Sequence, residues 1–123
     1  SPTLVLDPEG RAFITIGAAG AMRIITAVSQ IIMNVVDFGM PMDMAIEQPR
    51  IFNPAGGGKA GKLLIEEGIA PSTVDYLKLR GHDLEARPFS GYFGTAQGIL
   101  FDHTKGRMNG GADSRRLGVP VGY

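Results

Sequence analysis

The sequence predicts a layered fold of the α/β or α+β class. Short apolar runs rich in Ile and Val, bounded by Gly and Pro, indicate strands, and one long apolar run with helical spacing indicates a buried helix. Strands and helices fall into two clusters, which is typical of layered packing. We find no internal repeat and no domain boundary, so residues 1–123 are expected to form a single domain or a fragment of a larger one.

The chain opens with an expected hairpin. Strands over Thr3–Leu6 and Ala12–Ile16 flank Asp7-Pro8-Glu9-Gly10, which has the residues of a type I turn. The second strand is apolar almost without alternation, and this predicts burial on both of its faces.

The longest predicted helix covers Met22–Asp37. Its polar residues are spaced three or four apart and are expected to form one narrow stripe in water, with the rest of the helix packed between layers. They are Arg23, Thr26, Gln30, Asn34 and Asp37. Gly39, followed by Pro41, is placed to end this helix.

The remaining elements are shorter. We expect helices over Met42–Gln48 and Pro71–Arg80, a glycine-rich loop over Ile51–Lys62, strands over Lys62–Glu66, Leu84–Phe89, Thr95–Phe101 and Arg107–Gly110, and an irregular tail over Leu117–Tyr123. Pro71 suits a first helical turn, and Gly81 suits the end of that helix.

Composition excludes several classes of partner and chemistry. Lys plus Arg and Asp plus Glu each number 12, so there is no basic excess for nucleic acid or anionic membranes. The apolar stretch Ile24–Val36 is too short and too polar to span a membrane. With no cysteine, disulfides and thiol catalysis are excluded. From the sequence we expect no secretory signal in these residues and no cofactor.

The segment Gly17–Ala21 is the leading candidate site. It joins an apolar strand to a helix N-terminus, where backbone N–H groups suit a phosphate, a carboxylate or the oxyanion of acyl transfer. The alternative is a tight structural connection. The segment lacks the Gly-x-Gly-x-x-Gly dinucleotide pattern and the Gly-Lys-Ser/Thr of a P-loop, so nucleotide binding is disfavoured.

Other candidates favour structural roles. Ser1 is a candidate N-terminal nucleophile, because an N-terminal serine can use its own amine as the base. The simpler interpretation is that the sequence begins at this residue and that Ser1 has no catalytic role. His82 and His103 lie far apart without metal-ligand spacing and are interpreted as turn residues, so no metal is expected. The Gly-rich stretch 55–61 is interpreted as a mobile loop.

Two further segments contain arginines with two possible roles. Asp113-Ser114-Arg115-Arg116 offers guanidinium groups that suit a carboxylate, but an ion-paired or solvated loop is favoured. Arg50, after Pro49, is interpreted as a structural anchor.

The order of motifs resembles the C-terminal part of the small subunit of γ-glutamyltranspeptidases, over essentially the whole chain. The motifs are Ser1-Pro2-Thr3, Gly-x-x-Gly-x-x-Arg-Ile-Ile over Gly17–Ile25, Asp37-Phe38-Gly39-Met40, Ala45-Ile46-x-x-Pro49-Arg50, Gly81-His82, Ala96-Gln97, Asp113-Ser114-Arg115 and Gly122-Tyr123. No single motif decides the matter, but their order and spacing together are specific.

The resemblance implies an N-terminal-nucleophile hydrolase with an αββα sandwich. In this family one precursor cuts itself into a large and a small subunit. The Thr exposed at the new N-terminus attacks a γ-glutamyl amide such as glutathione and forms an acyl-enzyme. Water or an acceptor amine then resolves it. A periplasmic or extracellular location is also implied.

Two backbone positions carry over from the family. Its adjacent glycines, whose N–H groups form the oxyanion hole, fall on Gly20 and Ala21. Ala21 departs from the pattern, but its N–H remains, provided that the backbone there tolerates a Cβ. Ala18 and Ala19 replace the Ser-Pro that commonly precedes those glycines.

The family's nucleophile has no counterpart in this chain. The nucleophilic Thr and a serine pair for the substrate carboxylate align upstream of Ser1, and every threonine here is internal: Thr3, Thr15, Thr26, Thr73, Thr95 and Thr104. The segment alone is therefore expected to be inactive. Its expected partners are the rest of the small subunit and the large subunit, or itself, through exposed apolar surface.

Alternative functions stay open at this point. The segment after Pro49-Arg50 departs from the His-containing segment of many relatives, so related acylases acting on cephalosporin side chains or poly-γ-glutamate are alternatives. A non-catalytic scaffold or binding module that keeps the fold is another.

Overall fold

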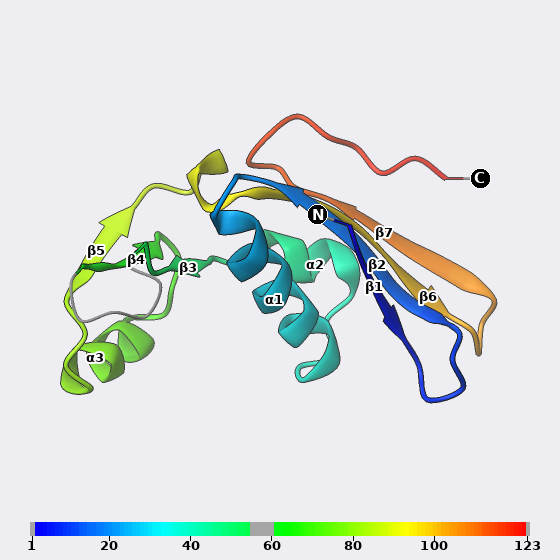
Figure 1. The fold of residues 1–123 in the computed structure, drawn as a ribbon, viewed down its shortest axis with the longest axis horizontal. Coiled ribbons are helices and arrows are strands. Elements are labelled where there is room, and N and C mark those ends of the chain that lie inside the picture. The colour runs from blue at the N-terminus through cyan, green and yellow to red at the C-terminus, as the bar shows by residue number, and fades with distance from the viewer. Residues whose placement is uncertain (1, 55–60, 123) are drawn as a thin grey trace.

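The described part of the chain forms two β-sheets and three α-helices, in a mixed α+β arrangement. The computed structural model describes residues 2–54 and 61–122. The larger sheet is antiparallel, with the order β1 (Thr3–Leu6), β2 (Ala12–Ala19), β6 (Thr95–Asp102) and β7 (Arg107–Ala112). The smaller sheet has the order β3 (Ile51–Phe52), β4 (Leu63–Glu66) and β5 (Leu84–Arg87), and its β4 and β5 run parallel. Figure 1 shows the two sheets on either side of the longest helix.

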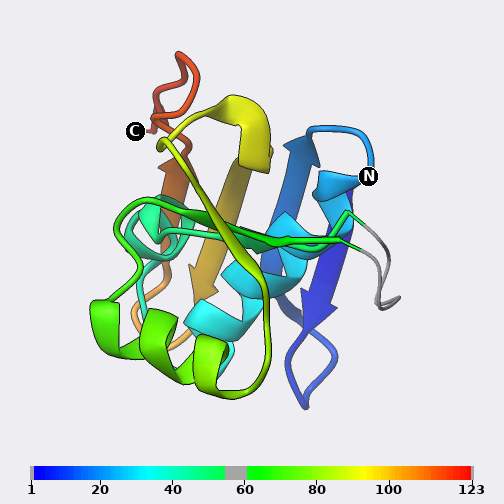
Figure 2. The same cartoon turned by 90° about the vertical axis from the view of Figure 1, so that its left-hand side faces the viewer.

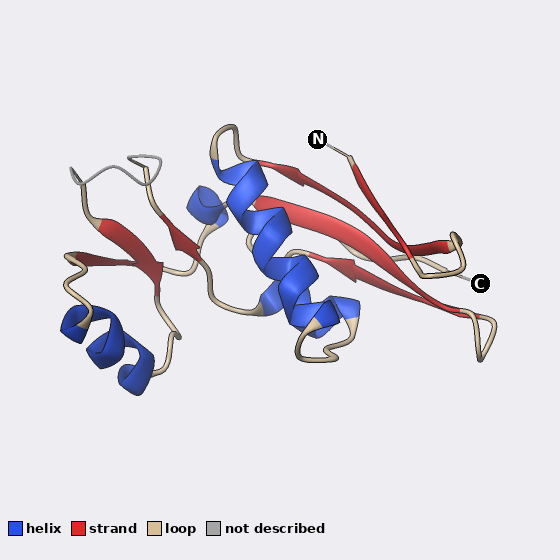
Figure 3. Cartoon of the chain, turned by 60° about the horizontal axis from the view of Figure 1, so that its bottom comes forward, coloured by secondary structure: helices blue, strands red, loops and turns tan. Residues whose placement is uncertain are grey.

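Two helices cover one face of the larger sheet. They are α1 (Arg23–Val36) and α2 (Met42–Glu47), and Figure 3 shows both against the same side of its strands. The core between sheet and helices consists mainly of buried aliphatic side chains: Ile14, Ile16, Val28, Ile31, Val35, Met42 and Ile46. The opposite face carries the C-terminal tail, which runs along β7 in Figure 1.

The smaller sheet has a helix of its own. Helix α3 (Pro71–Leu79) connects β4 to the parallel strand β5, and Figure 2 shows it beside that sheet. A 3₁₀ turn, η1 (Gly91–Phe93), then leads from the smaller sheet into β6 of the larger one. This connection passes close to the start of α1 (Figure 1).

The turn residues and helix-ending residues expected from the sequence are confirmed. The Gly10 N–H donates to the Asp7 carbonyl at 2.9 Å and closes the first hairpin. Gly39 ends α1 with a φ of +66°, and Gly81 follows α3 with a φ of +87°, both in the left-handed region that glycine tolerates. These features depend on neighbouring residues alone, and the sequence therefore predicts them well.

The expected loops over Gly17–Ala21 and Ile51–Lys62 were partly wrong. Strand β2 continues to Ala19, because Gly17, Ala18 and Ala19 pair with residues of β6. Ile51 and Phe52 form β3 by pairing with β4. Pairing with distant strands overrode local propensity in both places. The glycine-rich residues 55–60 lie outside the described residues.

The expected solvent stripe on α1 was wrong. The Gln30 side chain exchanges hydrogen bonds with the backbone of Ile51, at 2.9 and 3.0 Å, and Asn34 donates to the Ala45 carbonyl at 3.1 Å. The helix instead turns apolar side chains outward, and Ile25 is 74% exposed. Gln30 and Asn34 therefore hydrogen-bond α1 to β3 and α2 instead of facing water.

The expected burial of the second strand on both faces was also wrong. Ile14 and Ile16 are buried against the helices, whereas Thr15 between them is only half-buried. Leu4 pairs with Thr15 across the sheet and is 57% exposed. The outer face of the larger sheet is thus an apolar surface that the described residues leave largely open.

Candidate functional site

The candidate site is a short turn between β2 and α1. The Arg23 N–H donates to the Gly20 carbonyl, and the Ile24 N–H donates to the Ala21 carbonyl, both at 3.1 Å, so the helix begins directly after this turn. Gly20 has a φ of +145° and Ala21 a φ of +51°. Ala21 is the only described residue other than glycine with a positive φ. A backbone conformation that L-residues avoid is held here.

Two backbone N–H groups are free at this turn. Within residues 2–54 and 61–122, the N–H groups of Gly20 and Ala21 donate no hydrogen bond. They lie at the positive end of the α1 dipole, and the first turn of α1 contains no acidic side chain. Unpaired donors at a helix N-terminus suit a negatively charged oxygen.

Gly94 forms the wall behind this turn. A Cβ added to Gly20 would lie 2.8 Å from the Gly94 Cα, and a Cβ added to Gly94 would lie 3.3 Å from the Ala19 carbonyl oxygen. Only two glycines allow the backbones to approach this closely. The position of the turn therefore depends on the position of Gly94.

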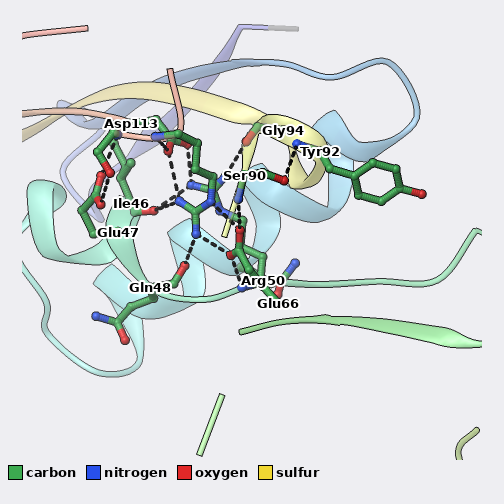
Figure 4. Close-up of polar contacts among 12 residues, drawn as sticks. Ile46, Glu47, Gln48, Arg50, Glu66, Ser90, Tyr92, Gly94 and Asp113 are labelled. Carbon is green, nitrogen blue, oxygen red and sulfur yellow. Dashed lines mark hydrogen bonds and ion pairs between the residues drawn. The ribbon is translucent and has the colours of Figure 1, made fainter. Parts of the chain in front are cut away.

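A buried ion-pair network lies on the other side of Gly94. Its members are Arg50, Glu66, Asp113 and Arg115, all at most 9% exposed. The Arg50 Nη2 donates to the Asp113 Oδ2 at 2.8 Å, and the Arg115 Nε donates to the Glu66 Oε1 at 2.8 Å. Figure 4 shows these contacts converging between β4 and the end of β7. The two positive charges match the two negative charges.

The same network fixes the backbone around it. The Arg50 Nη1 donates to the Gly94 carbonyl at 2.8 Å, and the Arg50 Nη2 donates to the Ile46 carbonyl at 2.7 Å. The Asp113 Oδ2 accepts the Ala96 N–H at 2.9 Å. Among the described residues, the network satisfies the buried side-chain nitrogens and oxygens of its four members except the Arg50 Nε, and such bonds are what a buried ion pair requires. The network thus holds Gly94, and through it the wall of the turn.

The charges of the network are set by their surroundings. Burial by itself would raise the pKa of Asp113, but the Arg50 guanidinium and the Ala96 N–H outweigh it and hold that pKa below its usual value. Burial lowers the pKa of Arg115, and hydrogen bonds to Glu66 and Asp113 reverse this and raise it. Both groups are therefore ionised at neutral pH.

The structure confirms the ion-paired interpretation of two segments. Arg50 is an anchor, and Asp113 and Arg115 are bonded to one another, with the Arg115 Nη1 3.0 Å from the Asp113 Oδ1. Arg115 therefore has no free fork for a ligand carboxylate, and Arg116 is exposed. Glu66 was not among the candidates taken from the sequence. Its only distinguishing feature there is that it is an acidic residue directly after the apolar run Leu63–Ile65.

The two histidines lie outside the candidate site. Both are exposed, and the His103 Nε2 lies 2.7 Å from the Ala12 carbonyl oxygen, with its ring stacked on Phe101. Among the described residues, no group of three His, Cys, Asp or Glu side chains is placed to hold a metal ion. Ser1 lies outside the described residues. No helix in the described part of the chain is long and apolar enough to cross a membrane.

Comparison with known proteins identifies what the chain is similar to. The family model described as gamma-glutamyltranspeptidase matches residues 1–123. A glutathione hydrolase proenzyme of Bacillus subtilis (strain 168) is 30% identical over 122 residues, and an acylase ACY 1 proenzyme of Pseudomonas sp. (strain V22) is 34% identical over 113 residues. These alignments cover 99% and 92% of this chain.

A solved structure has the same fold. The crystal structure of a Helicobacter pylori gamma-glutamyltranspeptidase mutant matches with a TM-score of 0.79 and 31% identity, over 94% of this chain and 60% of that chain. The α+β fold expected as part of an αββα sandwich is therefore confirmed. The chain spans about a fifth of the length of the curated relatives, 20% and 19% for the two named above.

Proposed function

Since this chain belongs to the gamma-glutamyltranspeptidase family, we propose that it is the C-terminal part of an enzyme that cleaves γ-glutamyl amides through an acyl-enzyme. In this proposal Gly20 and Ala21 supply the oxyanion hole. The Thr nucleophile belongs to protein outside this segment. Water or an acceptor amine then accepts the acyl group.

The free N–H groups of Gly20 and Ala21 carry the proposal. When a hydroxyl attacks an amide carbonyl, the carbonyl oxygen takes up the negative charge of the tetrahedral intermediate, and the hydroxyl proton passes to the departing amine. Two fixed donors facing that oxygen stabilise the intermediate more than the substrate, and each is worth about 10²–10³ in rate. The α1 dipole acts in the same direction.

The strained backbone of Ala21 also supports a catalytic role over a scaffold. A left-handed alanine costs about 1–2 kcal/mol. Such a conformation persists only where the surroundings impose it, and it is concentrated at functional sites. A module without catalysis would have no use for a strained turn whose donors are left unpaired.

A related acylase activity is the second candidate. The Pseudomonas relative named an acylase proenzyme is 34% identical to this chain, a similarity comparable to that of the glutathione hydrolase proenzymes. Both reactions pass through the same tetrahedral oxyanion, so Gly20 and Ala21 would act alike in each. The acyl group accepted by the whole enzyme distinguishes them.

The proposed partners are the rest of the small subunit and the large subunit of the same precursor. A groove on the outer face of the larger sheet, between β2, β6 and β7 and the tail over 118–122, is lined by Leu4, Ile99 and Met108 among others. Leu4 and Met108 are 57% and 69% exposed. Large apolar side chains exposed together on one face of a sheet are typical of a surface that contacts a partner. We expect the isolated segment to self-associate there.

The test uses the precursor in which this segment is encoded. Precursor that has matured is expected to release aniline from a γ-glutamyl anilide, whereas the 123-residue segment should give only the buffer rate. A cephalosporin amide assayed in parallel separates the acylase alternative. Turnover by the isolated segment would sink the proposal, and so would an inactive, fully folded precursor.

A further inference from the structure

The Arg23 guanidinium lies between two aromatic rings. Its Cζ is 3.9 Å from the centre of the Tyr92 ring and 5.3 Å from the centre of the Phe52 ring. Arg23 begins α1, Tyr92 lies in η1 and Phe52 lies in β3, so the stack joins three elements that are distant in sequence. Figure 4 shows Tyr92 pointing away from the buried ion-pair network, so this is a separate contact.

The Arg23 side chain makes no hydrogen bond or ion pair in the described part of the chain. Its Nε is buried without a hydrogen-bond partner, and no carboxylate pairs with its guanidinium there. By contrast, the two terminal nitrogens of Arg50 and the guanidinium of Arg115 donate to carboxylates and carbonyls, although the Arg50 Nε also lacks a partner among the described residues. Because its N–H donors have no partners, the Arg23 guanidinium is held by stacking of its planar faces on the aromatic rings. A lysine ammonium is not planar and cannot stack in this way.

The stack brackets the Gly20–Gly94 contact. The Arg23 N–H donates to the Gly20 carbonyl at 3.1 Å, so the arginine is bonded directly to the candidate oxyanion turn. Tyr92 belongs to the 3₁₀ turn that the Gly94 N–H closes by donating to the Gly91 carbonyl at 3.2 Å. The stack therefore draws together the two backbone segments whose glycines meet.

We propose that Arg23 is a positioning residue, which through its stack on Tyr92 and Phe52 fixes the direction of the Gly20 and Ala21 N–H groups. This inference rests on the proposed function, because it gives those N–H groups an oxyanion to face. The stack touches neither substrate nor reacting atoms. Its loss is expected to misalign the donors in the transition state and to leave substrate binding nearly unchanged.

Kinetics of the matured precursor test the proposal. Arg23→Met and Tyr92→Leu are each expected to lower kcat for a γ-glutamyl anilide by about tenfold to a hundredfold with little change in KM, as loss of alignment predicts. Affinity for a boronic acid analogue of the acyl group, which forms a tetrahedral adduct, should fall in proportion to kcat. Tyr92→Phe keeps the ring and is expected to retain kcat within about twofold.

Two control variants separate positioning from general effects. Arg23→Lys keeps the charge but not the planar face, so it should resemble Arg23→Met. Arg80→Met removes a contact of the same kind away from the turn, since the Arg80 Cζ, directly after α3, lies 6.0 Å from the centre of the Tyr76 ring. That variant is expected to match the wild type. A rise in KM with kcat unchanged, or an unchanged kcat in Arg23→Met, overturns the proposal.

Amide hydrogen exchange gives a readout that needs no activity. In Arg23→Met precursor, the Phe93 and Gly94 amides, which hydrogen-bond within the turn, are expected to exchange about tenfold faster, as loss of one cation–π contact predicts. Unchanged exchange overturns the inference even if wild-type precursor is inactive. An inactive wild type with faster exchange in the variant refutes the proposed function and keeps the positioning role.

Discussion

Gly20 and Gly94 meet so closely that a methyl group on Gly20 would stand 2.8 Å from the Gly94 Cα. The contact joins the end of β2 to the turn before β6. On one side of it are the free N–H groups of Gly20 and Ala21, and on the other is the carbonyl of Gly94, held by Arg50. The candidate oxyanion turn is thus backed by the buried ion-pair network.

Gly20→Ala is expected to be strongly destabilising. The added Cβ meets backbone that cannot rotate away, and the φ of +145° is one that alanine rarely adopts. Strain and overpacking together predict a loss of about 2–4 kcal/mol in the free energy of unfolding, measured by urea denaturation. Gly39→Ala is the matched control, because Gly39 also has a positive φ but nothing within 4 Å of its Cβ position. Gly39→Ala should lower the free energy of unfolding by only about 1 kcal/mol. Equal losses in Gly20→Ala and Gly39→Ala would contradict the argument that the added Cβ of Gly20→Ala meets Gly94.

Ala21→Gly is expected to be neutral or stabilising. Glycine accepts the φ of +51° without the cost that alanine bears, and this offsets the greater freedom of glycine in the unfolded chain. The free energy of unfolding should therefore rise by up to about 1 kcal/mol. Ala19→Gly, at the last residue of β2, is expected to lower the free energy of unfolding by about 0.5–1 kcal/mol. A loss at Ala21 as large as that at Ala19 would argue against the strained turn.

The arrangement of the molecule could be predicted from the sequence only where local signals decide it. The hairpin turn at Asp7, the end of α1 at Gly39 and the end of α3 at Gly81 each depend on residues a few positions apart. Strand β3 and the extension of β2 to Ala19 depend on partners in β4 and β6, which no local pattern reveals.

The site was only partly accessible from the sequence for the same reason. Gly20 and Ala21 stood out as a small-residue turn before a helix. Arg50 and Asp113 are 63 residues apart, and their pairing is a product of the tertiary fold. The Arg23 stack joins residues of three elements, and nothing in the sequence around Arg23 marks it.

Arg50→Met is expected to cost far more stability than loss of an exposed arginine. Removing one partner from a buried ion pair leaves Asp113 short of a cation and the Gly94 and Ile46 carbonyls without their donor. We expect a loss of about 3–5 kcal/mol in the free energy of unfolding. Arg11→Met removes an ion pair with Asp7 in which the arginine side chain is 53% exposed, and it should cost less than about 1 kcal/mol. Similar values for the two variants would contradict the structural role of the network.

Stability should fall at acid pH in part through Asp113. Its pKa is held below the ordinary value in the folded state, so its contribution is present above the unfolded pKa of about 3.9 and disappears as pH falls through the lower folded value. Urea denaturation between pH 2 and 7 should therefore show a decline below about pH 4 that is shallower in Asp113→Asn. An identical decline in both proteins would show that Asp113 is not the group responsible.

A structure of the matured precursor with a tetrahedral boronate adduct tests the central claim most directly. The adduct places an oxygen where the oxyanion of acyl transfer forms. We predict that this oxygen lies about 2.7–3.1 Å from the backbone nitrogens of both Gly20 and Ala21, the distance of a working oxyanion hole. An adduct oxygen bound by other groups, with these two N–H groups facing solvent, would contradict the account.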